Sequence, residues 1–158
     1  MIKLDDRDLK ILGVLQRDGR IPKNKLAAQV NLSPTACWER LKRLEDLGVI
    51  EGYGTRLSLD KLGSLATIFM QVELVSHRAE DFERFEKAVM EIDEVVECWA
   101  VGGGIDYFLK LVCKGVDAYQ RKVDEMLTAD IGLRRYYTYV VTKPVKDVSV
   151  IPFSVLSE

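Results

Sequence analysis

The protein has 158 residues, of which 47% are hydrophobic and 30% charged, and a formal net charge of −2 at pH 7. This composition is typical of a folded protein of one or two small domains, and it excludes an intrinsically disordered chain. No stretch approaches the roughly 18 consecutive apolar residues that a membrane span requires. The first residues also lack the apolar core of a signal peptide, so we expect a cytoplasmic protein with no membrane partner.

Cysteine and histidine are too scarce to suggest a disulfide framework, a metal site or a catalytic dyad. The three cysteines are widely spaced and His77 is the one histidine, so a Cys/His zinc site is hard to build. His77 lies in a polar stretch without a catalytic motif, and we interpret it as a solvated loop residue. The paired carboxylates at 5–6 and 80–81 lie where helix caps are expected. We therefore expect no enzyme, no metal and no cofactor, and a small enzyme or an enzyme's regulatory subunit is the least favoured class.

Charge is distributed unevenly along the chain. Residues 1–55 hold ten Lys and Arg against eight Asp and Glu, whereas the remainder has a net charge of −4. A mildly basic N-terminal part and an acidic remainder are typical of a two-domain protein whose N-terminal domain binds an anion.

Three short helices are predicted in the first fifty residues. Apolar residues recur at helical spacing over 5–18, where an aspartate can cap the start, and again over 22–30, where a proline occupies the first turn. A third helix begins at Ser33-Pro34, because serine is a preferred cap and proline is tolerated at the first helical position. Gly48 ends it. The tight turn between the last two helices is typical of a helix-turn-helix.

The third helix has one apolar face and one polar face. Its apolar residues step by four, three and three positions, which predicts a buried stripe. The residues of this stripe are Cys37, Leu41, Leu44 and Leu47.

The hydrophobic pattern changes after this helix. Residues 49–57 are broken by glycine and predict an extended connector strand, and residues 60–63 predict a turn or a short helical hinge. We therefore assign 1–60 to a helix-turn-helix domain with its connector strand, and 61–158 to a second domain.

The second domain alternates strands and helices. In chain order we predict a strand at 66–75, a helix at 79–92, strands at 95–101 and 107–113, a helix near 116–126 and a strand at 136–142. The order β-α-β-β-α-β is the ferredoxin-like plan, so the fold class is α+β. Its helices cover one face of the sheet. A second copy is the simplest cover for the other face, so we expect a dimer.

Several runs of residues carry a family resemblance. They are Ser33-Pro34-Thr35 followed by Arg40-x-x-x-Leu44-Glu45, then Gly48-Val49-Ile50, then Val101-Gly102-Gly103-Gly104-Ile105-Asp106-Tyr107, and Thr138-Tyr139-Val140-Val141. Together they closely resemble the Lrp/AsnC family of bacterial and archaeal transcription regulators. The resemblance implies a winged or simple helix-turn-helix joined to a ferredoxin-like domain that binds an effector and forms oligomers. It also implies assembly as dimers and as tetramers of dimers.

The third helix is the candidate DNA-reading element, because a recognition helix places its N-terminal residues at base edges in the major groove. Thr35 can donate or accept a hydrogen bond, Ala36 can contact a thymine methyl, and Glu39 can accept from a cytosine amine. The basic side chains favour phosphate. For Trp38, packing on the first helix and contact with DNA remain equal alternatives. The candidate DNA-binding residues are Ser33, Pro34, Thr35, Ala36, Trp38, Glu39, Arg40, Lys42 and Arg43.

The glycine run is the candidate effector site. Glycines leave backbone N–H groups open to a ligand carboxylate, and Asp106 supplies a carboxylate for an ammonium group, which together suit a free α-amino acid. A hairpin turn that binds no ligand is the alternative. The family resemblance implies an amino-acid effector here, between adjacent dimers, on Gly103 and Asp106. Family members often have threonine before that glycine, where this chain has Gly102. The candidate effector-binding residues are Gly102, Gly103, Gly104, Asp106, Thr138, Tyr139, Val140 and Val141.

These features predict a sequence-specific regulator of amino-acid metabolism genes that responds to an amino acid bound between subunits. The expected partners are double-stranded DNA, further copies of the chain and a free amino acid, and the expected location is the nucleoid. An effector-independent architectural protein that bends DNA is the alternative.

Overall fold

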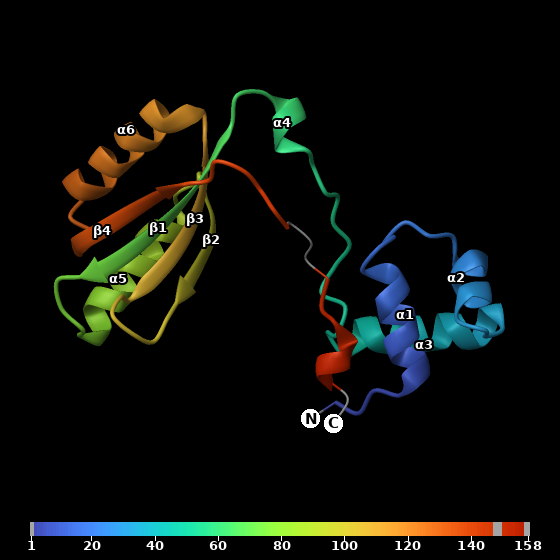
Figure 1. Ribbon diagram of the computed structural model, residues 1–158. Coiled ribbons are helices and arrows are strands. Elements are labelled where there is room, and N and C mark those ends of the chain that lie inside the picture. Colours follow the sequence, from blue (N-terminus) through green and yellow to red (C-terminus); the bar gives the residue numbers. More distant parts are fainter. Residues whose placement is uncertain (1, 147–149, 157–158) are drawn as a thin grey trace. The chain divides into compact units, whose positions relative to one another are not determined.

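The computed structural model describes residues 2–146 and 150–156 (Figure 1). The chain forms two compact units, one of Met1–Arg56 together with Lys146–Glu158, the other of Leu57–Val145. The break after Arg56 lies close to the boundary expected at residue 60. Within the described residues, no helix combines the length and the apolar character that crossing a membrane requires.

The first unit contains the three predicted helices, α1 (Asp6–Leu15), α2 (Lys23–Gln29) and α3 (Pro34–Asp46). Asp5 caps α1 in a capping box with Asp8, in which each carboxylate accepts from the other residue's backbone N–H. Ser33 Oγ accepts from the backbone N–H of Ala36 at 3.2 Å. The caps thus define where α1 and α3 begin.

The helices of this unit enclose a small apolar core. The fully or nearly buried side chains come from all three helices and from the turn after α2, and they include the predicted stripe of α3 except for its last residue. Leu47 is exposed, because it is the C-terminal cap residue, where the helical spacing that defined the stripe ends. The core residues are Ile11, Leu12, Leu26, Ala27, Val30, Cys37, Leu41 and Leu44.

The predicted connector strand at 49–57 is wrong, because these residues form no regular secondary structure. The backbone N–H groups of Val49 and Ile50 both donate to the carbonyl of Leu44, and Tyr53 donates its hydroxyl hydrogen to Glu45 Oε1 at 2.7 Å. These bonds hold the start of the segment against the end of α3, and none of the described strands pairs with it. A single helical turn, α4 (Leu59–Leu62), follows.

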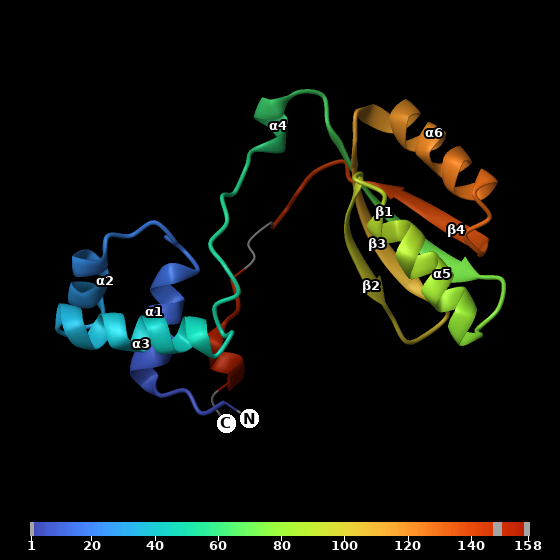
Figure 2. The ribbon, with the colours of Figure 1, turned by 180° about the vertical axis from the view of Figure 1, so that it is seen from behind.

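The C-terminal segment clusters with the first unit, although it was expected to lie in the second domain. The Ile151 N–H donates to Gln16 Oε1 at 2.6 Å, and Gln16 Nε2 donates back to the Ile151 carbonyl at 3.4 Å. Phe153, at the start of the short 3-10 helix η1 (Phe153–Leu156), packs against the helical core. A Cβ atom at Gly13 would lie 3.6 Å from its ring. Figures 1 and 2 show η1 beside α1 from both sides.

The second unit contains the predicted β-α-β-β-α-β order. Its elements are β1 (Ala66–Leu74), α5 (Ala79–Met90), β2 (Val95–Ala100), β3 (Tyr107–Cys113), α6 (Gly115–Thr128) and β4 (Leu133–Val140). The strands form one antiparallel sheet in the order β2-β3-β1-β4. This confirms the ferredoxin-like plan.

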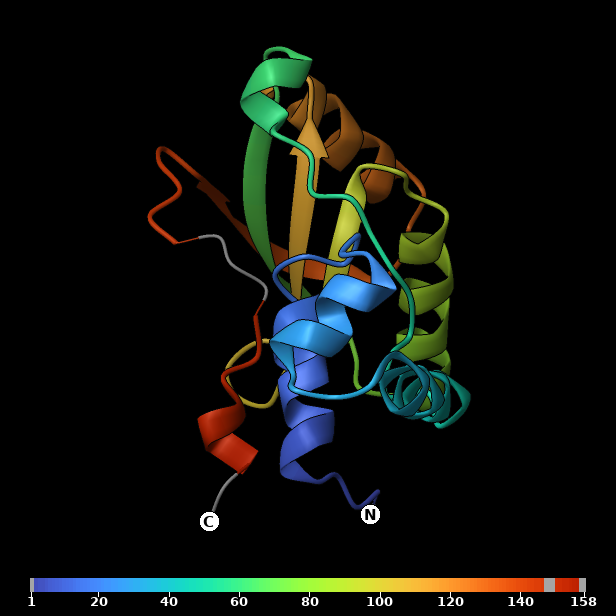
Figure 3. The ribbon, with the colours of Figure 1, turned by 90° about the vertical axis from the view of Figure 1, so that its right-hand side faces the viewer.

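The two helices cover one face of this sheet (Figure 3). Alternate residues of β1 and β3 are buried against α5 and α6, so the period of two in the sequence correctly identified the core face. Among the described residues of this unit, no helix packs on the opposite face. It carries an aromatic row in which the Phe69 and Phe108 rings lie 5.5 Å apart and the Trp99 and Phe108 rings lie 6.5 Å apart.

Candidate nucleic-acid interface and ligand site

The polar face of α3 projects away from the core of its unit. Thr35, Glu39 and Lys42 are spaced by four and three residues, so they lie on one face of the helix, opposite the buried stripe. All three are exposed. Pro34 is also exposed, and Ala36 is half-buried. The three exposed polar side chains form the part of α3 that is free to meet the edges of bases.

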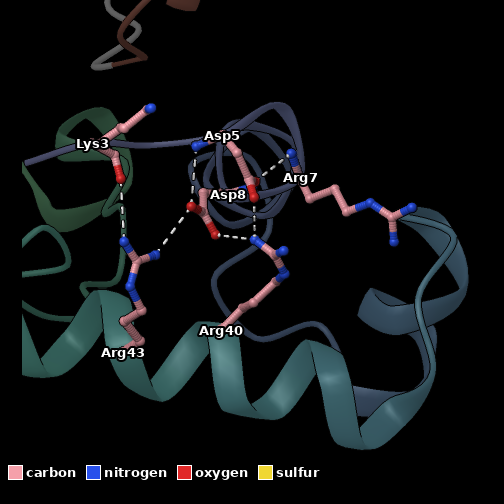
Figure 4. Close-up of polar contacts among 6 residues, drawn as sticks. All are labelled: Lys3, Asp5, Arg7, Asp8, Arg40 and Arg43. Carbon is pink, nitrogen blue, oxygen red and sulfur yellow. Dashed lines mark hydrogen bonds and ion pairs between the residues drawn. The ribbon is translucent and has the colours of Figure 1, made fainter.

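Two arginines of α3 are held by α1 (Figure 4). Arg40 Nη1 lies 2.7 Å from Asp5 Oδ2 and 2.8 Å from Asp8 Oδ1. Arg43 Nη1 lies 3.1 Å from Asp8 Oδ2, and its Nη2 donates to the Lys3 carbonyl at 3.2 Å. Asp8 is only 1% exposed. The carboxylate of Asp8 thus bridges both guanidinium groups and ties α3 to α1.

This network alters the electrostatics of the surface on the α1 side of α3. The backbone N–H of Asp8 donates to the Asp5 carboxylate and lowers its pKa, and the Arg40 guanidinium lowers that pKa further. The two arginines, the two aspartates, Lys3, Ala36 and Glu39 line a pocket of about 690 Å³. Its three basic and three acidic side chains compensate one another, so the pocket offers a phosphate no net attraction.

Trp38 lies on the opposite flank of α3. Its ring is covered by the ammonium of Lys23 from α2, with Nζ 3.2 Å from the ring centroid, and the residue is 41% exposed. The ring therefore pairs with the second helix and remains at the surface. Lys23 was not among the candidate residues, because a contact between residues on different helices has no local signature in the sequence.

The glycine run forms the turn between β2 and β3. The Val101 N–H donates to the Asp106 carbonyl across the turn. Gly103 has φ of 144°, a conformation that L side chains rarely adopt, and a Cβ at any of the three glycines would meet open space. The backbone at this turn is thus accessible to a ligand.

Asp106 anchors the turn to the end of β1. Its Oδ2 accepts from the Leu74 N–H at 2.7 Å, and its Oδ1 lies 3.0 Å from His77 Nε2. The His77 ring also stacks against Phe82, with centroids 6.0 Å apart. His77 is largely exposed, as predicted, but its pairing with Asp106 was not predicted, because the two residues lie far apart in the chain. A carboxylate has about four acceptor positions, so Asp106 retains the capacity to bind a further donor.

The four candidate residues at the end of β4 do not join the glycine turn in one chain. Thr138 pairs with Met70 and faces the helices, where its hydroxyl lies 2.5 Å from the Tyr119 hydroxyl. Tyr139 lies on the uncovered face, and its hydroxyl donates to Gln71 Oε1. Val140 and Val141 lie at the opposite end of β1 from Asp106. A site that contained both groups would need residues from a second copy.

The described side chains form no group of three or more His, Cys, Asp and Glu residues that could hold a metal ion. The three cysteines are free thiols, and burial raises the pKa of each.

Comparison with known proteins identifies both units. Residues 4–51 match a model of winged helix-turn-helix DNA-binding domains, and residues 67–151 match the model of the Lrp/AsnC ligand binding domain. The transcriptional regulatory protein DoeX of Halomonas elongata is 55% identical over 145 residues, which cover 92% of each chain. The leucine-responsive regulatory protein of Escherichia coli K12 is 39% identical over 143 residues, which cover 90% of this chain and 87% of that one.

Two solved structures have the same fold over nearly their whole length. One is a transcriptional regulator from Neisseria meningitidis in complex with L-Met, with a TM-score of 0.91 and 32% identity, covering 98% of this chain and 99% of that one. The other is an AsnC family regulator from Agrobacterium tumefaciens, also with a TM-score of 0.91 and 32% identity, covering 97% of this chain and 99% of that one.

Proposed function

Because the chain belongs to the Lrp/AsnC family of transcriptional regulators, with a DNA-binding and a ligand-binding domain, we propose that it regulates genes of amino-acid metabolism in response to a free amino acid. The observation that carries the proposal is the ligand-binding domain at residues 67–151. A relative of the same fold that was solved with L-Met supports an amino acid as the ligand class. The members of this family are regulators and not enzymes.

We assign sequence reading to the exposed face of α3. In a helix-turn-helix the second helix enters the major groove, where side chains hydrogen-bond to base edges. Thr35, Glu39 and Lys42 have the exposure and the common face that this requires. Arg40 and Arg43 hold α3 on α1 instead, so their first role is to orient the helix.

We assign effector binding to the turn at Gly102–Gly104 and to Asp106. Open backbone N–H groups suit the carboxylate of an amino acid, and the remaining acceptor positions of Asp106 suit its ammonium. The end of β4 would contribute Thr138–Val141 from a second copy, since these residues lie apart from the turn in a single chain.

Oligomerisation is part of this mechanism. The uncovered aromatic face of the sheet favours a homodimer, and tetramers of dimers would bring further ligand sites together. Two helix-turn-helix heads on one dimer would read half-sites related by a dyad. A ligand can shift such an assembly only by binding one arrangement better, and a tenfold preference corresponds to about 1.4 kcal/mol.

A thermal-shift screen of the full-length protein against the twenty amino acids tests the proposal. We expect one amino acid, or a small chemical group of them, to raise the unfolding temperature of the parent. The Asp106→Asn variant should lose this shift, because it keeps an oxygen for the Leu74 N–H but has no charge for the ammonium. Asp93→Asn, an exposed change in the same unit, is the control. Stabilisation by none of the amino acids would favour an architectural DNA-binding protein that needs no effector.

A further inference from the structure

Lys23 and Trp38 form a cation–ring pair at the surface of the helix-turn-helix unit. A cation within about 6 Å of a tryptophan centroid is attracted to the ring, and Lys23 Nζ lies well inside that range, at 3.2 Å. Lys23 is exposed, and Trp38 is 41% exposed. The Trp38 ring thus holds an exposed ammonium group against its face.

The two flanks of α3 differ in how their charges are compensated. On the flank toward α1, Asp5 and Asp8 neutralise Arg40 and Arg43. On the flank toward α2, Lys23 has no acidic partner among residues 2–146 and 150–156. Lys42 lies one turn after Trp38, on the same side of α3, and likewise has no ion pair in that part of the chain. Uncompensated positive charge is thus found on the α2 flank.

We infer that Lys23, seated on the ring of Trp38, contacts a DNA phosphate beside the recognition helix and contributes one phosphate contact per helix-turn-helix to the salt-dependent affinity. The inference rests on the proposed entry of α3 into the major groove. In a helix-turn-helix the helix before the recognition helix crosses the DNA backbone, and α2 is that helix. A lysine contacts phosphate as a point charge, so Lys23 adds affinity without reading sequence.

The indole ring acts as a positioning group in this arrangement. A free lysine side chain loses rotamer freedom when it binds a phosphate, whereas Lys23 is already held over Trp38. Loss of the ring therefore weakens binding while it leaves the number of phosphate contacts unchanged. Loss of the ammonium removes one contact from each head of a dimer.

Fluorescence anisotropy with a labelled random-sequence DNA duplex tests the inference, because phosphate contacts do not depend on the operator sequence. Each phosphate contact contributes about 0.9 to the slope of log K against log salt concentration. Lys23→Gln should make this negative slope shallower by about 1.8 for a dimer with both helix-turn-helix domains bound. Lys23→Arg, which keeps the charge, should restore the parent slope. Trp38→Leu should weaken binding several-fold at low salt and leave the slope near that of the parent.

Lys25→Gln is the matched control, since Lys25 is an exposed lysine of the same helix with no aromatic ring beneath it. We expect it to change the slope by less than half as much as Lys23→Gln. Equal losses in the two variants, or an unchanged slope in Lys23→Gln, would overturn the inference while the parent still bound DNA. If the parent bound no duplex at all, the proposed function would fail, and this inference with it.

Tryptophan emission provides a second readout. The chain has two tryptophans, so Trp99→Phe leaves Trp38 as the one emitter. Binding of the duplex should change the emission of Trp38 and protect it from acrylamide quenching, because the ring lies beneath the contact. An unprotected Trp38 in a variant that still binds the duplex would place this flank away from the DNA.

Discussion

Replacement of Asp8 by alanine should destabilise the helix-turn-helix unit by about 2 kcal/mol. Asp8 is buried and accepts from Arg40, from Arg43 and from the backbone N–H of Asp5. A hydrogen bond to a charged group contributes about 1.5–3 kcal/mol when buried. The Arg40 and Arg43 side chains are 31% and 47% exposed, so solvent screening reduces their two bonds to about 1.5 kcal/mol together. Loss of the reciprocal cap bond adds about 0.5 kcal/mol.

Urea denaturation of the Trp99→Phe background, followed by Trp38 emission, reports on this unit alone. Asp6→Ala is the control, because Asp6 is an exposed acid in the same first turn and should cost only about 0.3–0.5 kcal/mol. Asp8→Asn, which keeps one acceptor, should fall between the two. If Asp8→Ala cost no more than Asp6→Ala, the network would not stabilise the unit, and its role in orienting α3 would be refuted.

Three further predictions concern the C-terminal segment, the first helix cap and the sheet. Phe153→Ala should cost the first unit about 1–2 kcal/mol in the same urea assay, because the partly buried ring packs on its core, whereas Val145→Ala, an exposed change, should cost almost nothing. The lowered pKa of Asp5 means that its contribution is present above the unfolded value of 3.8 and is lost as the pH falls through its folded pKa. Asp5→Asn should therefore flatten the decline of stability as the pH falls below the unfolded value of 3.8, and an unchanged pH profile would contradict this. Thr138→Val should cost the second unit about 1–2 kcal/mol in thermal denaturation, because the hydroxyl of the buried Tyr119 loses its partner; a neutral result would show that water replaces the threonine.

The periodicity of apolar residues predicted a helix or strand correctly wherever that element packs one face on a core. The period of α3 identified Cys37, Leu41 and Leu44 as buried, and the alternation of β1 identified its core face. The caps at Asp5 and Ser33 could be read directly, because they depend on residues within one helical turn. The connector at 49–57 was misread as a strand, since extended composition alone does not supply a hydrogen-bonding partner.

The candidate site was predicted only in part, for the same reason. The sequence placed nine residues on and around α3, but it could not separate the arginines that bind Asp5 and Asp8 from the side chains that remain free. The sequence does contain two aspartates three residues apart, Asp5 and Asp8, and two arginines three residues apart, at 40 and 43. This matched spacing could have indicated the network. The faces of β4 were also undetermined, because the side on which Thr138 or Tyr139 lies depends on its register with β1.

The amino-acid order by itself determined the helix-turn-helix, the β-α-β-β-α-β order and the glycine turn, because each depends on the spacing of residues that are close in the chain. The tertiary structure decided which charges are neutralised and which distant residues are in contact. Lys23 packs on Trp38, and His77 pairs with Asp106. Ile151 and Phe153 contact the first unit at Gln16 and at its helical core. These contacts join residues far apart in sequence. Their existence depends on how helices and strands pack, and packing is set by the whole core rather than by any local pattern.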